Sequence, residues 1–204
     1  MLRSDLFFRL TALPYRLLTR HPVWERHCAR MALELPGGAR RVLDLGCGPA
    51  NSTAHLGPGA VGGDRAMPML RLARKRWPKL VCLDAAELPV RTGSLDAVTF
   101  HSVLYLLPSR ERTLREVARA LRRGGRAVLL EPREGHAATL LGLWRALPSP
   151  HWTMTAALWR TMSRAYGRFS AAGLREALEH AGLRVLRIEE TLGGMGLLAV
   201  AEKP

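Results

Sequence analysis

The stretch "RRVLDLGCGPANSTAHLGPGAVGGD", residues 40–64, decides the fold. An apolar run ends in Asp44 and is followed at once by Gly46 and Gly48, and a second apolar run ends in Asp64. Short apolar runs bounded by glycine turns are typical of buried strands in a parallel sheet. In such sheets the glycine turn after the first strand is where nucleotide-type ligands bind. The stretch therefore predicts a ligand held between two strand ends.

The alternation of strand-like and helical patterns continues along the chain. Apolar runs at 79–84, 94–101 and 125–132 alternate with helical patterns at 67–77 and 109–125, the second with Ser109 as N-cap and glycine at its end. A capped helix at 170–183 precedes two strand-like runs that a glycine turn joins. We therefore predict an α/β fold. It is a Rossmann-like doubly wound sheet of seven strands, mostly parallel, with an antiparallel C-terminal hairpin strand.

Helical segments flank this core on the substrate side. Residues 4–35 predict two helices broken near "HPVW", and residues 135–165 are rich in Leu, Trp and Met. We divide one domain, 1–204, into an N-terminal helical lid (1–38), a cofactor-binding core (39–134), a helical substrate-side insertion (135–168), and the last helix with the hairpin (169–204). The lid and the insertion fit a cover over a lipophilic substrate or contact with an anionic membrane surface. Alternatively, their apolar residues are core contacts to the sheet.

The composition bears on the partners, the location and the source of the protein. The formal net charge of +14 favours anionic partners such as RNA, phospholipid surfaces or acidic substrates, but scattered arginines are equally what a GC-rich genome encodes. Three widely spaced cysteines, with no signal-peptide pattern and no long apolar run, predict a reducing, cytoplasmic location. The chain has no glutamine and a single asparagine, Asn51, which hints at a thermophilic source.

Aspartates mark the predicted strand ends. Asp44, Asp64 and Asp84 follow one another at 20-residue steps, and Asp64 has the position of a ribose-binding acid. The fingerprint of a dinucleotide-binding fold is G-x-G-x-x-G, but here Asn51 occupies the position of the third glycine. The Asp44 carboxylate would also repel a pyrophosphate and attract a cationic amino group. The pattern therefore favours a nucleoside that bears an amino acid.

These motifs together resemble the class I S-adenosylmethionine-dependent methyltransferases, in the small-molecule branch of the ubiquinone/menaquinone methyltransferase type. The resemblance is carried by "VLDLGCGPA" (42–50), "GGDRAMPMLRLAR" (62–74), "CLDAAELPVRTGSLDAVTFHSVLYLL" (82–107) and "LREVARALRRGGRAVLLEP" (114–132). It implies S-adenosylmethionine as the cofactor. It further implies that Asp64 binds both ribose hydroxyls, and that Asp84 and Ala85 hold the adenine through its exocyclic amine and a backbone N–H.

Candidate site residues follow from the motifs and the resemblance. The expected cofactor-binding residues are Asp44, Gly46, Cys47, Gly48, Asn51, Asp64, Arg65, Met69, Asp84, Ala85, Phe100 and His101. The expected substrate-pocket residues are Tyr15, Tyr105, Trp152 and Tyr166. His101 is the candidate base if one is needed, or else a pocket wall, and His136 and His151 are weaker candidates. Glu131 is expected to cap a helix or edge the pocket, and no metal site is expected because the histidines and cysteines lack ligand spacing.

The implied reaction is in-line methyl transfer to a small, lipophilic acceptor. An RNA or protein methyltransferase, suggested by the charge, and a catalytically silent cofactor-binding protein are the alternatives. "TFHSVLY" (99–105) lacks the Asn/Asp-Pro-Pro-aromatic tetrad that is typical of amino-group methylation of nucleobases. A nucleic-acid substrate is therefore less favoured but stays an alternative. Gly57-Pro58-Gly59 predicts a first helix clipped to about two turns, with the N-terminal segment covering the exposed side of the cofactor.

Overall fold

The centre of the molecule is one mixed sheet. The computed structural model describes residue 8, residues 10–135 and residues 139–204. Within these residues a seven-stranded sheet has the order β3-β2-β1-β4-β5-β7-β6. The strands are β1 (Val42–Leu45), β2 (Val61–Asp64), β3 (Leu80–Cys82), β4 (Leu95–His101), β5 (Leu121–Pro132), β6 (Arg184–Thr191) and β7 (Gly196–Glu202). The pairs among β1–β5 are parallel, and β7 runs antiparallel to β5 and β6, which confirms the predicted fold class.

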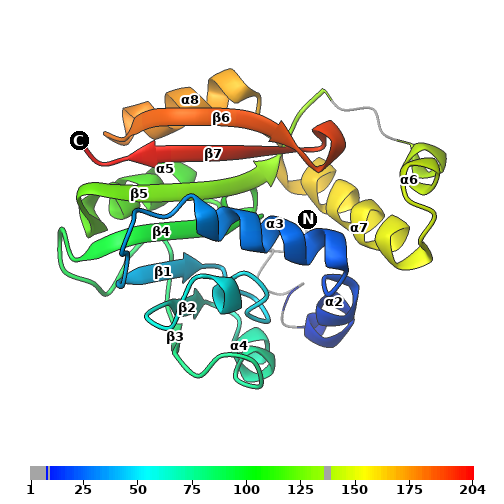
Figure 1. Cartoon of the computed structure of the whole chain (residues 1–204), viewed down its shortest axis with the longest axis horizontal. Helices are drawn as coiled ribbons and strands as arrows, with labels where there is room; N and C mark the ends of the chain where they lie inside the picture. Colours follow the sequence, from blue (N-terminus) through cyan, green and yellow to red (C-terminus); the bar gives the residue numbers. More distant parts are fainter. Residues whose placement is uncertain (1–7, 9, 136–138) are drawn as a thin grey trace.

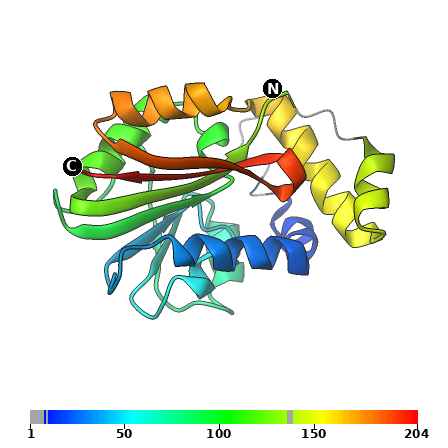
Figure 2. The same ribbon diagram turned by 45° about the horizontal axis from the view of Figure 1, so that its top comes forward.

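Helices cover both faces and one end of this sheet. They are α2 (Ala12–Leu18), α3 (Pro22–Leu33), α4 (Met67–Ala73), α5 (Arg110–Ala120), α6 (Leu140–Ala146), α7 (Pro150–Tyr166) and α8 (Ala171–His180), with short 3-10 turns η1 (Thr53–His55), η2 (Leu104–Leu106) and η3 (Leu192–Gly194). Helix α3 and η1 cover one face, and α5 and α8 cover the other (Figures 1 and 2). Helices α2, α6 and α7 gather beyond the carboxyl ends of β1 and β5 (Figure 1).

Local chemistry explains where the helices begin and end. The break predicted near "HPVW" lies at His21, whose Nδ1 accepts a hydrogen bond from the Val23 N–H and so caps α3. Ser170 caps α8 in the same way, as predicted. The predicted ends of α5 are wrong in detail, because the Ser109 side chain makes no capping bond and the helix ends at Ala120, before any glycine. The chain enters β5 directly, since buried Leu121 pairs with Leu95 across the sheet.

The helix in the segment between β1 and β2 is shorter than the sequence predicts. In place of a helix of about two turns, only the three-residue turn η1 is formed. The chain must pass close to the start of β1, because a Cβ at Gly59 would lie 2.0 Å from the Arg40 carbonyl oxygen. Gly57, at φ +89°, turns the backbone toward that contact. The glycines therefore return the chain to β2 before a helix can form.

Unlike Asp44 and Asp64, which lie at or near the carboxyl ends of their strands, Asp96 lies near the amino end of its strand. It lies at the start of β4 and accepts hydrogen bonds from the Arg40 and Arg41 N–H groups and from the Arg122 Nε, at 3.0, 2.9 and 2.8 Å. It therefore ties the amino ends of β1, β4 and β5 together. In the part of the chain that the structure describes, no helix is both long and apolar enough to cross a bilayer.

Candidate functional site

The carboxyl ends of the parallel strands open into a cavity of about 1070 Å³. It lies where strand order reverses, between β1 and β4, as binding sites of open α/β sheets do. The segments after β1, β2, β3 and β4 form its floor, and Phe8, Tyr15 and Tyr166 reach it from the N-terminal region and from α7. This volume is at the upper end of small-molecule sites, so the cavity has room for a nucleoside ligand and a second small molecule.

The glycine turn after β1 is packed too tightly for side chains. Gly46 has φ +65°, and a Cβ there would lie 2.5 Å from both γ-carbons of Val103. Gly48 has φ +51° but faces open space, with Tyr15 Cε1 4.0 Å from its would-be Cβ. Gly46 therefore seats the turn against the segment after β4, while Gly48 leaves its backbone open to the cavity.

Asp64 connects the end of β2 to this turn. Its Oδ2 accepts a hydrogen bond from the Gly48 N–H at 2.9 Å, and its Oδ1 accepts one from the Ala66 N–H at 2.7 Å. Each oxygen keeps a second lone pair, and the carboxylate lines the cavity. Burial raises the pKa of Asp64, although the backbone N–H donors oppose the shift. The residue can thus accept two further hydrogen bonds from a ligand.

Asp84 and Arg65 form a more open edge of the cavity. Asp84 accepts a hydrogen bond from the Ala86 N–H at 2.9 Å and pairs with Arg65 across 3.4 Å. Both side chains are about half exposed. Ala85 lines the cavity beside Asp84, and its N–H has no protein partner in the described residues. This edge offers an acceptor and a donor side by side.

Asp44 lies behind the glycine turn rather than in the cavity wall. It is fully buried, and its carboxylate accepts hydrogen bonds from Ser52, Thr53 and Thr99 hydroxyls at 2.7, 2.6 and 2.8 Å. Burial raises its pKa, against the effect of these three donors. The geometry makes Asp44 the group that shapes the turn from beneath. Its predicted attraction for a ligand amino group stays a prediction.

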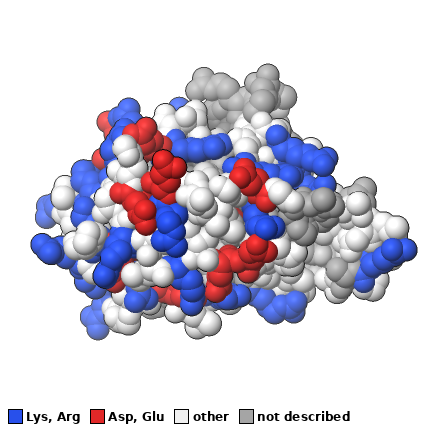
Figure 3. Space-filling view, turned by 90° about the horizontal axis from the view of Figure 1, so that it is seen from above, with Lys and Arg blue, Asp and Glu red and all other residues white. Residues whose placement is uncertain are grey.

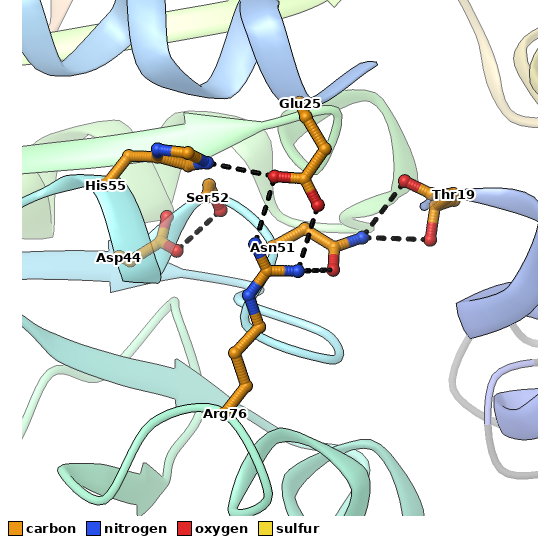
Figure 4. A network of polar contacts seen from close by, with 7 residues as sticks. All are labelled: Thr19, Glu25, Asp44, Asn51, Ser52, His55 and Arg76. Carbon is orange, nitrogen blue, oxygen red and sulfur yellow. Dashed lines mark hydrogen bonds and ion pairs between the residues drawn. The ribbon is translucent and has the colours of Figure 1, made fainter. Parts of the chain in front are cut away.

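Asn51 fastens the turn to the N-terminal helix. Its Nδ2 donates to the Thr19 carbonyl and hydroxyl oxygens, and its Oδ1 accepts from Arg76, which also pairs with Glu25 (Figure 4). Helix α2 thereby lies against the turn, and its Tyr15 stands over Gly48. That the N-terminal segment covers the exposed side of the cofactor stays a prediction.

The segment after β4 forms the opposite wall. His101 is 91% buried, its ring packs edge-on against Trp24, and burial lowers its pKa to about 4. His101 Nε2 and the Ser102 Oγ have no hydrogen-bond partner in the described residues. Glu131 accepts N–H bonds from Val103, Leu104 and Tyr105 at 3.1, 2.8 and 3.1 Å, so it caps η2 and holds this wall in place. Burial raises the pKa of Glu131 to about 7.

The part of the cavity formed by η2, the start of α5 and the end of α7 combines aromatic and apolar side chains with arginines. Tyr105, Tyr166 and Leu107 line it. Arg110 donates to the Tyr105 and Tyr166 carbonyl oxygens, both at 2.6 Å, and lies over the Phe169 ring. Arg110 therefore clamps α7 to η2 and fixes the distance between the two tyrosines.

The structure brings most of the predicted site residues to the cavity and leaves some behind it. The lining includes Gly46, Gly48, Asp64, Arg65, Met69, Asp84, Ala85, His101, Tyr15, Tyr105 and Tyr166. The residues behind it are Asp44, Cys47, Asn51, Phe100 and Trp152, all buried. His136 lies outside the described residues, and His151 bonds the Leu17 and Leu18 carbonyls. Among the described side chains, no three potential metal ligands meet.

Sequence reasoning missed several lining residues. Phe8, Ser102 and Arg110 line the cavity. Ser102 follows His101 directly and adopts φ +62°, a left-handed backbone conformation that a serine in the sequence does not predict. Arg110 reaches the site from the start of α5, and no local pattern separates it from the many other arginines.

Comparisons with known proteins agree with this geometry. The family model described as a methyltransferase domain matches residues 43–129. A demethylmenaquinone methyltransferase of Mycobacterium sp. (strain KMS) is 35% identical over 195 residues, spanning 89% of this chain and 83% of the relative. A methyltransferase solved with the Haloferax volcanii activator Trm112 has a TM-score of 0.75 at 21% identity, with 97% of each chain covered. A methyltransferase from Thermotoga maritima has a TM-score of 0.74 at 18% identity, covering 98% of this chain and 99% of that one.

Proposed function

Since this chain belongs to the class I S-adenosylmethionine-dependent methyltransferases, we propose that it methylates a small, lipophilic, aromatic acceptor. One feature of the cavity supports this acceptor. Beside its charged and polar residues, the cavity is lined by apolar and aromatic side chains, among them Phe8, Tyr105 and Tyr166. A relative that spans most of the chain is named for demethylmenaquinone, a lipophilic aromatic molecule.

The residues of the inner cavity fit S-adenosylmethionine. Both Asp64 oxygens have lone pairs left for the ribose hydroxyls, and hydrogen bonds to a carboxylate are the stronger kind. The Asp84 carboxylate suits an exocyclic amine, and the unpartnered Ala85 N–H suits a ring nitrogen. The glycine turn gives close backbone approach for the amino-acid part. When bound, the cofactor supplies an activated methyl group on a sulfonium.

Positioning is the main contribution of the chain to such a reaction. In an in-line displacement the acceptor atom forms its bond to the methyl carbon as the carbon–sulfur bond breaks, and correct placement lowers the barrier. Glu131 fixes the wall that carries His101 and Tyr105, and Arg110 fixes Tyr105 against Tyr166. These contacts fix the positions of the two tyrosines, and the proposed place of a flat acceptor is beside them.

His101 is the residue proposed to receive the acceptor's proton where one is released. Its Nε2 has no partner in the described residues, and with a pKa of about 4 it is neutral near pH 7. A neutral imidazole can accept a proton, but one with so low a pKa is a weak base. An acceptor that ionises readily, such as a phenol or a quinol, therefore suits this wall better than an unactivated alcohol or amine.

The test is methyl transfer from methyl-labelled S-adenosylmethionine by the full chain. Reduced demethylmenaquinone in detergent is one acceptor, and total tRNA and a protein pool are the competing ones. We expect label in the quinol fraction and at least tenfold less in RNA or protein. The Asp64→Asn variant is the control for cofactor dependence and should lose the label. Label in RNA or protein with none in the quinol would overturn the proposed acceptor.

A further inference from the structure

One end of the molecule exposes apolar side chains on three helices. We call α2, α6 and α7 together the helical end. Helix α2 contacts α7, since Thr155 donates to the Leu18 carbonyl at 2.6 Å, and α6 packs on α7 (Figure 1). Its exposed apolar residues, with exposed fractions from 43% to 73%, are Leu10, Leu13, Leu17, Leu141, Trp144 and Met154. Leu13 and Leu17 share one face of α2 at helical spacing, and Leu10 precedes the helix, so the three leucines give this end an apolar stripe.

The helical end carries cations and no acids. The sequence has no Asp or Glu from residue 6 to 24 or from 135 to 175. Arg16 and Arg20 follow Leu13 and Leu17 by three positions, which places each cation beside the apolar stripe. In Figure 3 the atoms of described residues at the right end, where α6 and α7 lie in Figure 1, are blue and white, with no red. An apolar stripe flanked by arginines is the pattern of helices that lie in a membrane interface.

A basic hollow lies next to the stripe. It has a volume of about 330 Å³ and is lined by Arg16, Arg20, Lys75 and Arg76, with Glu25 as its acid. Glu25 is already paired with Arg76 and His55. The side chains of Arg16, Arg20 and Lys75 have no partner among the described residues. Three cationic side chains without a partner in the described part of the chain surround this small hollow, and this arrangement suits a phosphate group.

We propose that the helical end docks on an anionic phospholipid bilayer, with the leucine stripe at the acyl boundary and a lipid phosphate in the basic hollow. RNA would engage the arginines but gain nothing from the exposed leucines. A second copy of this chain would bring two strongly positive ends together, and their repulsion opposes that contact. The docking rests on these surface features and not on the identity of the methyl acceptor.

Docking would also orient the cavity. Helices α2 and α7, which carry the exposed Leu13, Leu17 and Met154, also carry Tyr15 and Tyr166 of the cavity wall. A lipophilic acceptor would then enter from the bilayer without crossing water. This consequence, unlike the docking itself, rests on the proposed function.

Vesicle flotation of the full chain tests the docking. The vesicles are pure phosphatidylcholine, or phosphatidylcholine with phosphatidylglycerol. We expect flotation only with the anionic vesicles, weakened when salt rises from about 0.1 M to about 1 M and the Debye length falls from about 10 Å to about 3 Å. A chain that stays unbound on anionic vesicles at the lower salt overturns the proposal.

Paired variants locate the surface. Leu13→Ser/Leu17→Ser should weaken anionic-vesicle binding at least about tenfold, and Arg16→Gln/Arg20→Gln about fivefold for each charge. The matched controls are Leu33→Ser/Leu186→Ser, which changes leucines exposed on α3 and β6, and Arg91→Gln, and they should bind as the native chain does. Equal losses in test and control variants would show non-specific adhesion and overturn the docking surface.

Two readouts separate this inference from the others. Quenching by bromine-labelled lipid should include a component that Trp144→Phe removes, because Trp144 is exposed at the helical end. Affinity for S-adenosylhomocysteine in solution should be unchanged in the Leu13→Ser/Leu17→Ser variant, which shows that it is folded. Quenching unaltered by Trp144→Phe, or binding to RNA that phosphatidylglycerol vesicles do not compete, would contradict the docking.

Discussion

The Asp64 carboxylate accepts a hydrogen bond from the Gly48 N–H at 2.9 Å, so the end of β2 holds the turn that follows β1. The same carboxylate lines the cavity. One residue therefore couples the shape of the glycine turn to the part of the cavity that fits a ribose.

Replacing the two turn glycines by alanine should have unequal effects. Gly46→Ala places a methyl group 2.5 Å from Val103, and we expect a loss of about 3 kcal/mol in the free energy of unfolding. Gly48→Ala adds only backbone strain, of about 1 kcal/mol. Chemical denaturation measures both. The double variant Gly46→Ala/Val103→Ala should be less destabilised than the sum of its single changes, and strict additivity would argue against the Val103 contact.

Asn51→Ala should loosen the N-terminal cover. It removes the bonds to Thr19 and Arg76, so residues 11–20 should exchange amide hydrogens faster. Thr19→Val is the matched partner variant, and it should have a smaller effect because the Thr19 carbonyl still accepts from Asn51. Exchange in residues 11–20 that neither variant alters would mean that the cover is held by packing alone.

Asp96→Asn should make the chain less stable at neutral pH and less sensitive to acid. Burial opposes ionisation, but hydrogen bonds from Arg41 and Arg122 hold the pKa of Asp96 well below its usual range. A lowered pKa stabilises the fold above the unfolded-state pKa of about 4, and this contribution is lost as pH falls below it. We expect a loss of about 2 kcal/mol at neutral pH, shrinking in acid.

The control for Asp96 is Glu87→Gln, which breaks an exposed pair with Arg112. Its effect on unfolding should stay under about 0.5 kcal/mol at every pH. If Asp96→Asn and Glu87→Gln behave alike in denaturation curves across pH, Asp96 does not tie the strands as described.

The rate of methyl transfer should show no histidine titration near pH 6.5. Burial lowers the pKa of His101 to about 4, so its charge does not change around neutrality. Single-turnover rates across pH check this, with His101→Asn as the comparison. A step in the native profile near pH 6.5 that disappears in His101→Asn would contradict the buried, neutral state of His101.

The strand pattern and the acidic strand ends were predictable because each is local. Asp64 and Asp84 follow short apolar runs, and a parallel sheet brings such strand ends to one edge. The position of Asp44 was not predictable, because its three hydroxyl partners include Thr99 on another strand. The first helix was predicted to have about two turns, but only the three-residue turn η1 forms. The reason is the close approach of Gly59 to Arg40, which depends on packing and not on helix propensity.

Other parts of the site lacked any local signal. Arg110 joins two carbonyl groups that are 61 residues apart in sequence, those of Tyr105 and Tyr166. Trp152 was expected in the substrate pocket, but it packs beside His21 behind the cavity. The sequence of an apolar helix does not show whether a tryptophan on it faces a cavity or a neighbouring helix.

Calorimetry with S-adenosylmethionine and S-adenosylhomocysteine tests the central claim most directly. We expect both to bind the native chain, and Asp64→Ala to weaken binding about 100-fold or more through two lost carboxylate hydrogen bonds. Asp84→Ala should cost about tenfold, since its carboxylate is half exposed. Thermal unfolding of each variant verifies folding. No heat of binding with the native chain, or unchanged affinity in a folded Asp64→Ala variant, would contradict the account.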